Sequence, residues 1–497
     1  MPRSRRALAC LAASVALVAG MLIGNATTAI AGETQTYLVL YKSLAVPADA
    51  SSSVNAAGGQ LVASYDAIGV AVARSDSATF RSSMKADTRI AEVASTANSG
   101  MRLSPEEETG SDSATVDVPA TDSSEPLFGL QWDMVQIHTP EAHLVTGGDP
   151  SVVVGDIDTG LDFTHPDIAP HYDAADSADC SSGAPTPLAV GSDQNGHGTH
   201  TAGTIAAAAN GIGIIGVAPN VRIAGIKSST NAGFFFPEMV VCSFMWAGSH
   251  GIDVTNNSYF ADPWLFNCKN DPEQKAIYSA EQRAIKYAQS KGTIVVAAEG
   301  NQADDLAHPT QDATSPDNTT PVVRDITNAC AVVPVEVPGV VGVTANGNLR
   351  YKSYYSSYGI GTADVVAPGG DRRFQVTAAA VNGRVLSTWP SYLGCAISVV
   401  DQGAKYCYLQ GTSMASPHVA GLAALIRSQH PGMRASSVQG LIQSTADPIA
   451  CPASYTAPVN YTAFPAVDNG APQVCTGGTG YNSFNGHGQV NALSAVK

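Results

Sequence analysis

Basic residues are scarce in this chain of 497 residues. It contains 26 lysines and arginines against 42 aspartates and glutamates, so its formal net charge at pH 7 is −16. Because proteins bind nucleic acid by neutralising phosphates with clustered basic side chains, this balance argues against a nucleic-acid partner. Hydrophobic residues make up 44% of the sequence and charged residues only 14%, a composition that argues against disorder. We therefore expect a soluble, acidic, globular protein.

The closely spaced cysteine pairs of zinc ribbons and thioredoxin-like proteins are also missing, since no Cys-X-X-Cys sequence occurs. Eight of the nine cysteines lie after residue 31, and an even number of cysteines in an exported chain suggests disulfides. Two pairs are predicted because each closes a short loop: Cys395 with Cys407, and Cys451 with Cys475. Free, buried thiols are the alternative, and spacing alone does not assign the other four cysteines.

Long apolar runs are absent after the first 31 residues. Three arginines among the first six residues precede an apolar stretch over 7–23, and small residues follow at Ala29 and Ala31. This order is typical of a secretory signal peptide, residues 1–31, cleaved after Ala31. A membrane anchor is the alternative, although the length of the stretch barely permits it. We therefore expect a secreted, extracellular protein that has no membrane contact after cleavage.

The remaining chain divides into three parts by composition. Residues 32–100 combine short strand and helix patterns, which predicts a small α+β domain. From Ser104 to Glu125 the chain carries seven acidic residues and no basic one, amid Ser, Thr and Pro. This composition predicts a solvated linker over residues 101–126. Residues 127–497 are then the largest domain.

Short runs rich in Val and Ile alternate with helical patterns in this largest domain. Such runs occur at 151–157, 221–226 and 293–298. Fully apolar strands separated by helices predict an α/β fold with a mostly parallel central sheet between two layers of helices. In such sheets, functional sites form at the carboxyl ends of the strands.

Polar side chains with complementary chemistry stand at strand ends and helix starts. Asp158 ends an apolar run, His197 opens a helical pattern, and Ser413 begins an apolar helix. A hydroxyl needs an adjacent base to act as a nucleophile at neutral pH, and that base needs a partner that fixes its tautomer. Ser413, His197 and Asp158 can supply these three functions. Asn301 follows another strand and can donate a hydrogen bond to an oxyanion.

The motifs around these residues are specific when taken together. Asp158-Thr-Gly, His197-Gly-Thr-His, Asn301 and Gly-Thr-Ser413-Met-Ala-Ser-Pro-His occur in the order Asp, His, Asn, Ser. The large domain thereby resembles the subtilisin-like serine proteases, the subtilases of peptidase family S8. The resemblance implies a subtilisin-like three-layer fold. It also implies Asp158, His197 and Ser413 as the catalytic triad and Asn301 as the oxyanion-hole donor.

The N-terminal domain is similar to the inhibitory, I9-like propeptides of this family, which have a ferredoxin-like fold. The resemblance implies that residues 32–100 assist folding and block the active site as an intramolecular inhibitor until they are removed. The chain is then a zymogen, and the exposed acidic linker is the expected place of cleavage. The implied function is a secreted serine endopeptidase that hydrolyses peptide bonds of proteins or peptides through an acyl-enzyme.

Four residues are expected to bind substrate. Ser258, Tyr259 and Phe260 occupy a segment that usually reads Ser-Leu-Gly in the family and pairs with extended substrate. Gly233 belongs to a segment that resembles the opposite, glycine-rich edge. The aromatic rings are expected to narrow the cleft, and the alternative is that they pack beneath a loop.

The resemblance implies no cofactor for catalysis. Structural calcium is possible, because calcium sites are frequent in the family, but the sequence assigns no ligand. Asp304, Asp305 and His308 cluster after Asn301 and could line the primary pocket, bind calcium or form a solvated loop surface. His200 lacks a recognisable partner for a metal site and is expected to pack within its helix.

Two other functions compete with a serine protease. An aspartic protease needs two carboxylates that share a proton, and Asp-Thr-Gly occurs only once. A non-catalytic binding or scaffold protein with a subtilase fold is the second alternative. It is expected to lack at least one polar group of the site, whereas all four are present.

Overall fold

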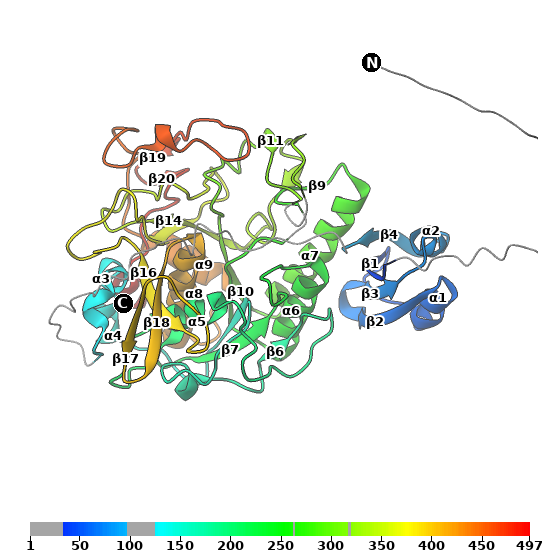
Figure 1. The fold of residues 1–497 in the computed structure, drawn as a ribbon, viewed down its shortest axis with the longest axis horizontal. Helices are drawn as coiled ribbons and strands as arrows, with labels where there is room; N and C mark the ends of the chain where they lie inside the picture. The colour runs from blue at the N-terminus through cyan, green and yellow to red at the C-terminus, as the bar shows by residue number, and fades with distance from the viewer. Residues whose placement is uncertain (1–32, 97–124, 262–263, 317–319) are drawn as a thin grey trace, which may run out of the picture.

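The computed structural model describes residues 33–96, 125–261, 264–316 and 320–497. The predicted signal peptide and most of the predicted acidic linker therefore lie outside the described residues. A small N-terminal unit (blue in Figure 1) stands beside a large domain, which the structure describes from residue 125 onward.

The N-terminal unit, residues 33–96, is a four-stranded antiparallel sheet of order β2-β3-β1-β4 with two helices. The order β-α-β-β-α-β is that of a ferredoxin-like fold, as predicted for this part. Alternate residues of a strand point to opposite faces, so Val39 packs toward the two helices while Leu38 and Leu40 face away from them. Its elements are β1 (Gln35–Tyr41), α1 (Ala50–Ala56), β2 (Gly59–Tyr65), β3 (Val70–Ser75), α2 (Phe80–Lys85) and β4 (Ile90–Ser95).

The large domain is built on a seven-stranded sheet of order β15-β14-β10-β8-β5-β7-β6. All its neighbouring strands are parallel, for example Val154 of β5 opposite Val254 of β8. The carboxyl ends of these strands therefore lie along one edge. The strands are β5 (Val153–Asp158), β6 (Ala178–Asp179), β7 (Arg222–Lys227), β8 (Val254–Asn257), β10 (Ile294–Ala298), β14 (Val341–Asn346) and β15 (Val365–Pro368).

Helices cover both faces of this sheet, which confirms the predicted three-layer α/β fold. Val154 of β5 packs toward α5 and α8, whereas Val153 and Ile157 pack toward α6 and α7. The main helices are α5 (His197–Ala206), α6 (Pro237–His250), α7 (Pro272–Ser290) and α8 (Thr412–Gln429). Shorter helices are α3 (Trp132–Gln136), α4 (Thr139–His143), α9 (Ala435–Ser444) and α10 (Ala492–Val496).

Smaller sheets lie outside the central one. β16 (Val385–Trp389), β17 (Ser398–Asp401) and β18 (Ala404–Leu409) form an antiparallel sheet of order β16-β18-β17. The remaining pairs are β9 (Asn267–Cys268) with β13 (Cys330–Ala331), β11 (Gln311–Asp312) with β12 (Arg324–Asp325), and β19 (Gly477–Gly478) with β20 (Tyr481–Asn482).

The N-terminal unit packs on α6 and α7 of the large domain (Figure 1). Leu38 and Leu40 of its open sheet face belong to the same apolar cluster as residues of both helices. At the rim of this interface, the Arg283 guanidinium of α7 donates hydrogen bonds to the carbonyl oxygens of Tyr41 and Ile68, each at 3.1 Å. The interface therefore has an apolar centre and a polar edge.

The described residues form four disulfides: Cys180–Cys242, Cys268–Cys330, Cys395–Cys407 and Cys451–Cys475. The last two are the pairs predicted from short loop length, so that prediction is confirmed. The first two close longer segments of 62 residues each, which spacing alone did not assign.

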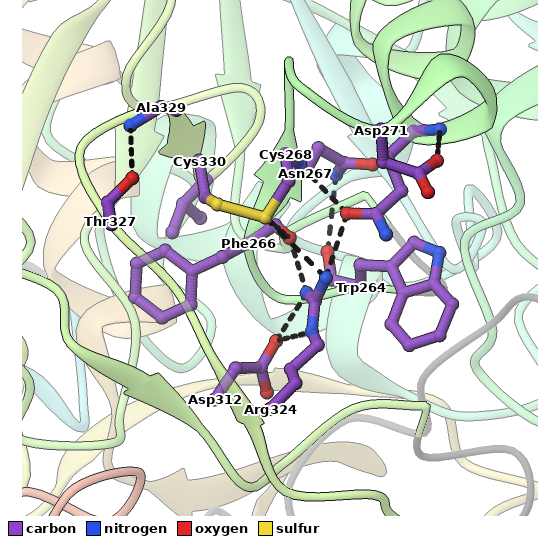
Figure 2. Close-up of a disulfide and its surroundings, with 12 residues drawn as sticks. Trp264, Phe266, Asn267, Cys268, Asp271, Asp312, Arg324, Thr327, Ala329 and Cys330 are labelled. Carbon is purple, nitrogen blue, oxygen red and sulfur yellow. Dashed lines mark hydrogen bonds and ion pairs between the residues drawn. A yellow bond between two sulfur atoms is a disulfide. The ribbon is translucent and has the colours of Figure 1, made fainter.

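The Cys268–Cys330 disulfide lies beside an ion pair that holds the long insertion after Asn301 (Figure 2). Arg324 donates to one oxygen of Asp312, at 3.1 Å from Nε and 2.6 Å from Nη2. Its guanidinium also lies 4.5 Å from the ring centre of Trp264. The Asp312 side chain has no exposed surface, and Arg324 is its ion-pair partner.

Arg324→Met is expected to lower the free energy of unfolding by about 3–5 kcal/mol, because it leaves the buried Asp312 carboxylate without its cation. Adding Asp312→Asn should recover part of the loss, since a neutral amide needs no counter-charge. Chemical denaturation in a Ser413→Ala background, which prevents self-digestion by the expected protease, measures both changes. An equal loss in the single and double variants would attribute the effect to lost packing instead.

Candidate active site

Asp158 and His197 form a buried hydrogen-bonded pair at the carboxyl edge of the sheet. Asp158 is the last residue of β5, and His197 is the first residue of α5. His197 Nδ1 lies 2.8 Å from Asp158 Oδ1, which also accepts the backbone N–H of Thr159 at 2.7 Å. Burial raises the pKa of the Asp158 carboxyl, and the adjacent His197 opposes that rise. The pair fixes the orientation of the imidazole.

Ser413 is the second residue of α8, where unpaired backbone N–H groups create positive potential. Its side chain is almost buried, with 3% of the residue surface exposed. Its hydroxyl lies 3.2 Å from the carbonyl oxygen of Ser258, and the Ser258 hydroxyl donates to the Ser413 carbonyl at 2.9 Å. These reciprocal contacts tie the start of α8 to the segment that follows β8.

Asn301 is held by the same helix start. Its Oδ1 atom accepts hydrogen bonds from the backbone N–H and the hydroxyl of Thr412, both at 2.9 Å. The turn before it is made by Gly300, whose φ of 104° is a conformation that favours glycine. Because the amide group is planar, anchoring its oxygen on Thr412 turns its nitrogen to the opposite side.

Asp193, which the sequence reasoning did not single out, organises the backbone around His197. Its Oδ1 atom accepts from the Thr159 hydroxyl at 3.0 Å and from Gly196 N–H at 2.7 Å. Its Oδ2 atom accepts from the N–H and hydroxyl of Thr199 at 3.0 and 2.7 Å. One buried carboxylate therefore joins the residue after Asp158 to both flanks of His197.

Asp156 is a second carboxylate that the sequence reasoning missed. It accepts hydrogen bonds from the Thr201 hydroxyl at 2.7 Å and the Asn256 amide at 2.8 Å. Asn256 in turn accepts from the Ser416 hydroxyl of α8 at 2.7 Å. Burial, and then the neighbouring Asp158, raise the pKa of Asp156 well above its usual value. Its position two residues before Asp158, within an apolar strand, was the signal that could have identified it.

Tyr259, Phe260 and Gly233, the other residues expected to bind substrate, lie in packed or turn positions. Tyr259 is only 4% exposed, and its ring stacks on Phe235 with 4.4 Å between ring centres. Phe260 is partly buried against the apolar cluster of α6 and α7. Gly233 lies in a turn, with its N–H bonded to the carbonyl of Thr230. This packing corresponds to the alternative in which the Tyr259 ring lies beneath a loop.

Two polar residues that the sequence analysis considered for metal binding, His200 and Asp304, are buried beside other protein groups. His200 is buried, its Nε2 lies 3.0 Å from the Cys407 carbonyl, and burial lowers its pKa to about 3. Asp304 is buried next to Asp468, and burial together with that neighbour raises its pKa well above the usual value. Within the described residues, no group of three or more His, Cys, Asp or Glu side chains could hold a metal ion.

The sequence model of the subtilase family matches residues 149–488, more than half of the chain. The chain belongs to the subtilase family. This confirms the resemblance to subtilisin-like serine proteases.

Curated relatives of this subtilase include bacterial proteases. It is 33% identical over 320 residues to an alkaline protease of Alkalihalobacillus alcalophilus, and the match covers 64% of each chain. It is 32% identical to Subtilisin Savinase of Lederbergia lenta, over 64% of this chain and 91% of the relative. The match thus spans less than two thirds of the alkaline protease.

Solved structures with the same fold include two proteases. One is the epidermin leader peptide processing serine protease of Staphylococcus aureus, with a TM-score of 0.67, 22% identity, and coverage of 94% of this chain and 98% of the other. The second is fervidolysin of Fervidobacterium pennivorans, with a TM-score of 0.63, 22% identity, and coverage of 94% and 61%. These structural similarities show that the chain shares its fold with both proteases.

Asp193→Ala is expected to lower the free energy of unfolding by about 3 kcal/mol, because it leaves several buried donors around His197 without an acceptor. Hydrogen exchange should become faster at the Gly196 and Thr199 amides in particular. Asp193→Asn retains one acceptor oxygen and should lose less. Unchanged exchange at those two amides in Asp193→Ala would contradict an organising function for this carboxylate.

Proposed function

We propose that this subtilase is a serine endopeptidase that hydrolyses peptide bonds through an acyl-enzyme. The observation that carries the proposal is the buried Asp158–His197 hydrogen bond of 2.8 Å at the carboxyl edge of the sheet. The helix that bears Ser413 packs against β5, β8 and β10 along this same sheet. Asn301 is anchored on the residue immediately before Ser413.

In the proposed reaction, His197 removes the proton from the Ser413 hydroxyl as its oxygen attacks the peptide carbonyl carbon. Asp158 stabilises the imidazolium that forms and holds it in the orientation that serves both proton transfers. His197 then gives the proton to the leaving amine, and the peptide C–N bond breaks. A water molecule, activated by the same imidazole, hydrolyses the ester and regenerates Ser413.

The tetrahedral intermediates carry a negative oxygen that needs hydrogen-bond donors. We assign this function to the Asn301 side-chain amide and the Ser413 backbone N–H at the start of α8. The contact of Asn301 Oδ1 with Thr412 supports this assignment, because it fixes the amide before substrate binds. All proton transfers and charges of this mechanism are handled by protein groups, so catalysis requires no cofactor. Structural calcium stays an expectation without an assigned ligand.

The N-terminal unit is proposed to be an intramolecular inhibitor and folding aid. Its apolar docking face on α6 and α7 supports a stable association. Residues 32–100 are then the propeptide, residues 101–126 the linker that is cut, and residues 127–497 the mature protease. Removal of the propeptide exposes the site to protein or peptide substrates.

Export to the extracellular space is part of the proposal. The amino-terminal residues 1–31 support it through their signal-like sequence. In the part of the chain that the structure describes, no helix combines the length and apolar character needed to cross a membrane.

Ser413→Ala is expected to abolish hydrolysis of a casein-type substrate, because it removes the nucleophile. The wild-type protein, once its propeptide is released, should also be labelled at Ser413 by a fluorophosphonate, and peptide mapping identifies the labelled residue. Ser416→Ala is the matched control, since this hydroxyl lies one helical turn further along α8 and bonds to Asn256. A wild-type protein that is folded and free of propeptide, yet neither cleaves nor reacts, would be a scaffold instead.

Docking of the propeptide is expected to weaken as the pH rises. Glu238 of α6 is buried beside Thr96, the last described residue of the N-terminal unit. Burial raises the pKa of Glu238, and this outweighs the opposing effects of its own backbone N–H, Thr96 and Arg74. The docked state therefore favours protonated Glu238, and its stability is lost as the pH rises through the raised pKa. One proton changes the docking equilibrium by at most about tenfold per pH unit.

Hydrogen exchange in the Ser413→Ala variant measures this effect, with exchange at β1 and β4 compared with exchange at β5 in the same molecules. The internal reference cancels the direct effect of pH on exchange. Glu238→Gln should make the ratio less dependent on pH. A residual dependence is expected from Glu281, whose pKa is also raised by burial and then by Glu238. An equal pH dependence in both proteins would reject Glu238 as its origin.

A further inference from the structure

The small sheet β16–β18 (yellow in Figure 1) packs against α5, the helix that begins with His197. The Thr388 hydroxyl of β16 donates a 2.6 Å hydrogen bond to the Thr199 carbonyl of α5. The residue at Gly203 must be small, because a Cβ there would overlap the Thr388 and Ser387 side chains. The sheet thus lies directly on the helix.

Trp389, the last residue of β16, covers the backbone just before His197. The indole occupies the space that a Cβ on Gly196 would need, and Trp389 is only 2% exposed. Gly196 has a φ of 99°, a conformation that favours glycine, and it precedes His197 directly. Any movement of the indole therefore changes the packing at the residue that starts α5.

The Cys395–Cys407 disulfide fixes this tryptophan in place. Trp389 Nε1 donates to the Gly394 carbonyl at 3.0 Å, and the next residue, Cys395, is bonded to Cys407 of β18. The Cys407 carbonyl lies 3.0 Å from Nε2 of His200, one turn along α5 from His197. The disulfide loop therefore contacts α5 directly at His200, and through Trp389 it reaches Gly196, the residue before the helix.

A buried apolar cluster connects Trp389 with the residue that follows Ser413. Trp389 and Cys407 belong to one buried cluster with Met414, the residue after Ser413. Met414 has no exposed surface. The cluster therefore touches the chain immediately before His197 and immediately after Ser413.

We propose that Trp389, locked by the Cys395–Cys407 loop, is a positioning residue that sets the placement of His197 relative to Ser413. This inference rests on the proposed function, because it concerns proton transfer between these two side chains. Trp389 contacts the Gly196 backbone and acts through it. Displacing a catalytic group by about 1 Å can reduce turnover by about a hundredfold.

Trp389→Ala is expected to reduce kcat about tenfold to a hundredfold with KM nearly unchanged, because substrate contacts remain while proton transfer is misaligned. The acid limb of the pH–kcat profile should shift, since the surroundings of His197 change. Trp389→Phe keeps an aromatic ring over Gly196, so this variant should retain most of the wild-type kcat. Unchanged kcat in Trp389→Ala would overturn the proposal.

Two disulfide variants provide a matched comparison. Cys395→Ser with Cys407→Ser releases the loop that holds Trp389, whereas Cys451→Ser with Cys475→Ser releases a loop of 24 residues elsewhere in the chain. We expect kcat to fall severalfold in the first variant and to stay near the wild-type value in the second. Equal effects would attribute the loss to general loosening and overturn the proposal. This comparison also decides the matter if Trp389→Ala does not fold.

A measurement without turnover separates this inference from the proposed function. The Nδ1–H proton of His197, assigned by its disappearance in His197→Gln, reports the hydrogen bond to Asp158 in NMR spectra. Its resonance should broaden or move in Trp389→Ala and in the Cys395/Cys407 variant, and remain in Trp389→Phe and in the Cys451/Cys475 variant. A wild-type protein that fails to cleave would reject the proposed function, whereas an unchanged resonance in the first two variants would reject the positioning by Trp389.

Discussion

The site depends on aspartate side chains that are buried where the parallel strands of the central sheet end. An ionised carboxylate without partners is costly to bury, so each one must be surrounded by donors. Asp158 meets His197 and Thr159, whereas Asp193 meets donors on both sides of His197. The polar contacts that satisfy these buried carboxyl groups therefore also determine where the imidazole lies. Fold stability and site geometry share the same hydrogen bonds.

The same edge explains why two helices begin at the site. Parallel strands end together there, and the helices that follow begin with unpaired N–H groups. α8 uses its first N–H to hold Asn301, and α5 has its first turn capped by Asp193. The glycines Gly196 and Gly300 provide the turns that allow these approaches. Backbone groups that are unpaired at helix starts thus become the scaffold of the site.

Much of the fold followed from the sequence because its signals are local. Apolar runs of strand length, separated by helical patterns, were sufficient to predict a central sheet covered by helices on both faces. The motifs then identified Asp158, His197, Asn301 and Ser413. The surroundings of Asp193 could not be predicted in this way. Its partners come from the end of β5 and from both flanks of His197, and only the folded chain brings them together. Tyr259 shows the same limit, because its stacking on Phe235 depends on two separate loops.

The sheet β16–β18 shows why a segment with loop-like composition can still be ordered. Its apolar residues Trp389, Cys407 and Leu409 form one face that packs in a buried cluster, and Leu386, Tyr406 and Tyr408 of the other face pack in a second cluster. Successive residues of a strand point to opposite faces, so a few apolar residues in two short strands can bury both faces of a small sheet. The Cys395–Cys407 disulfide then fixes the loop that follows β16. A long insertion next to a helix start should therefore be judged by the apolar residues of its short strands and by its cysteines rather than by its mean composition.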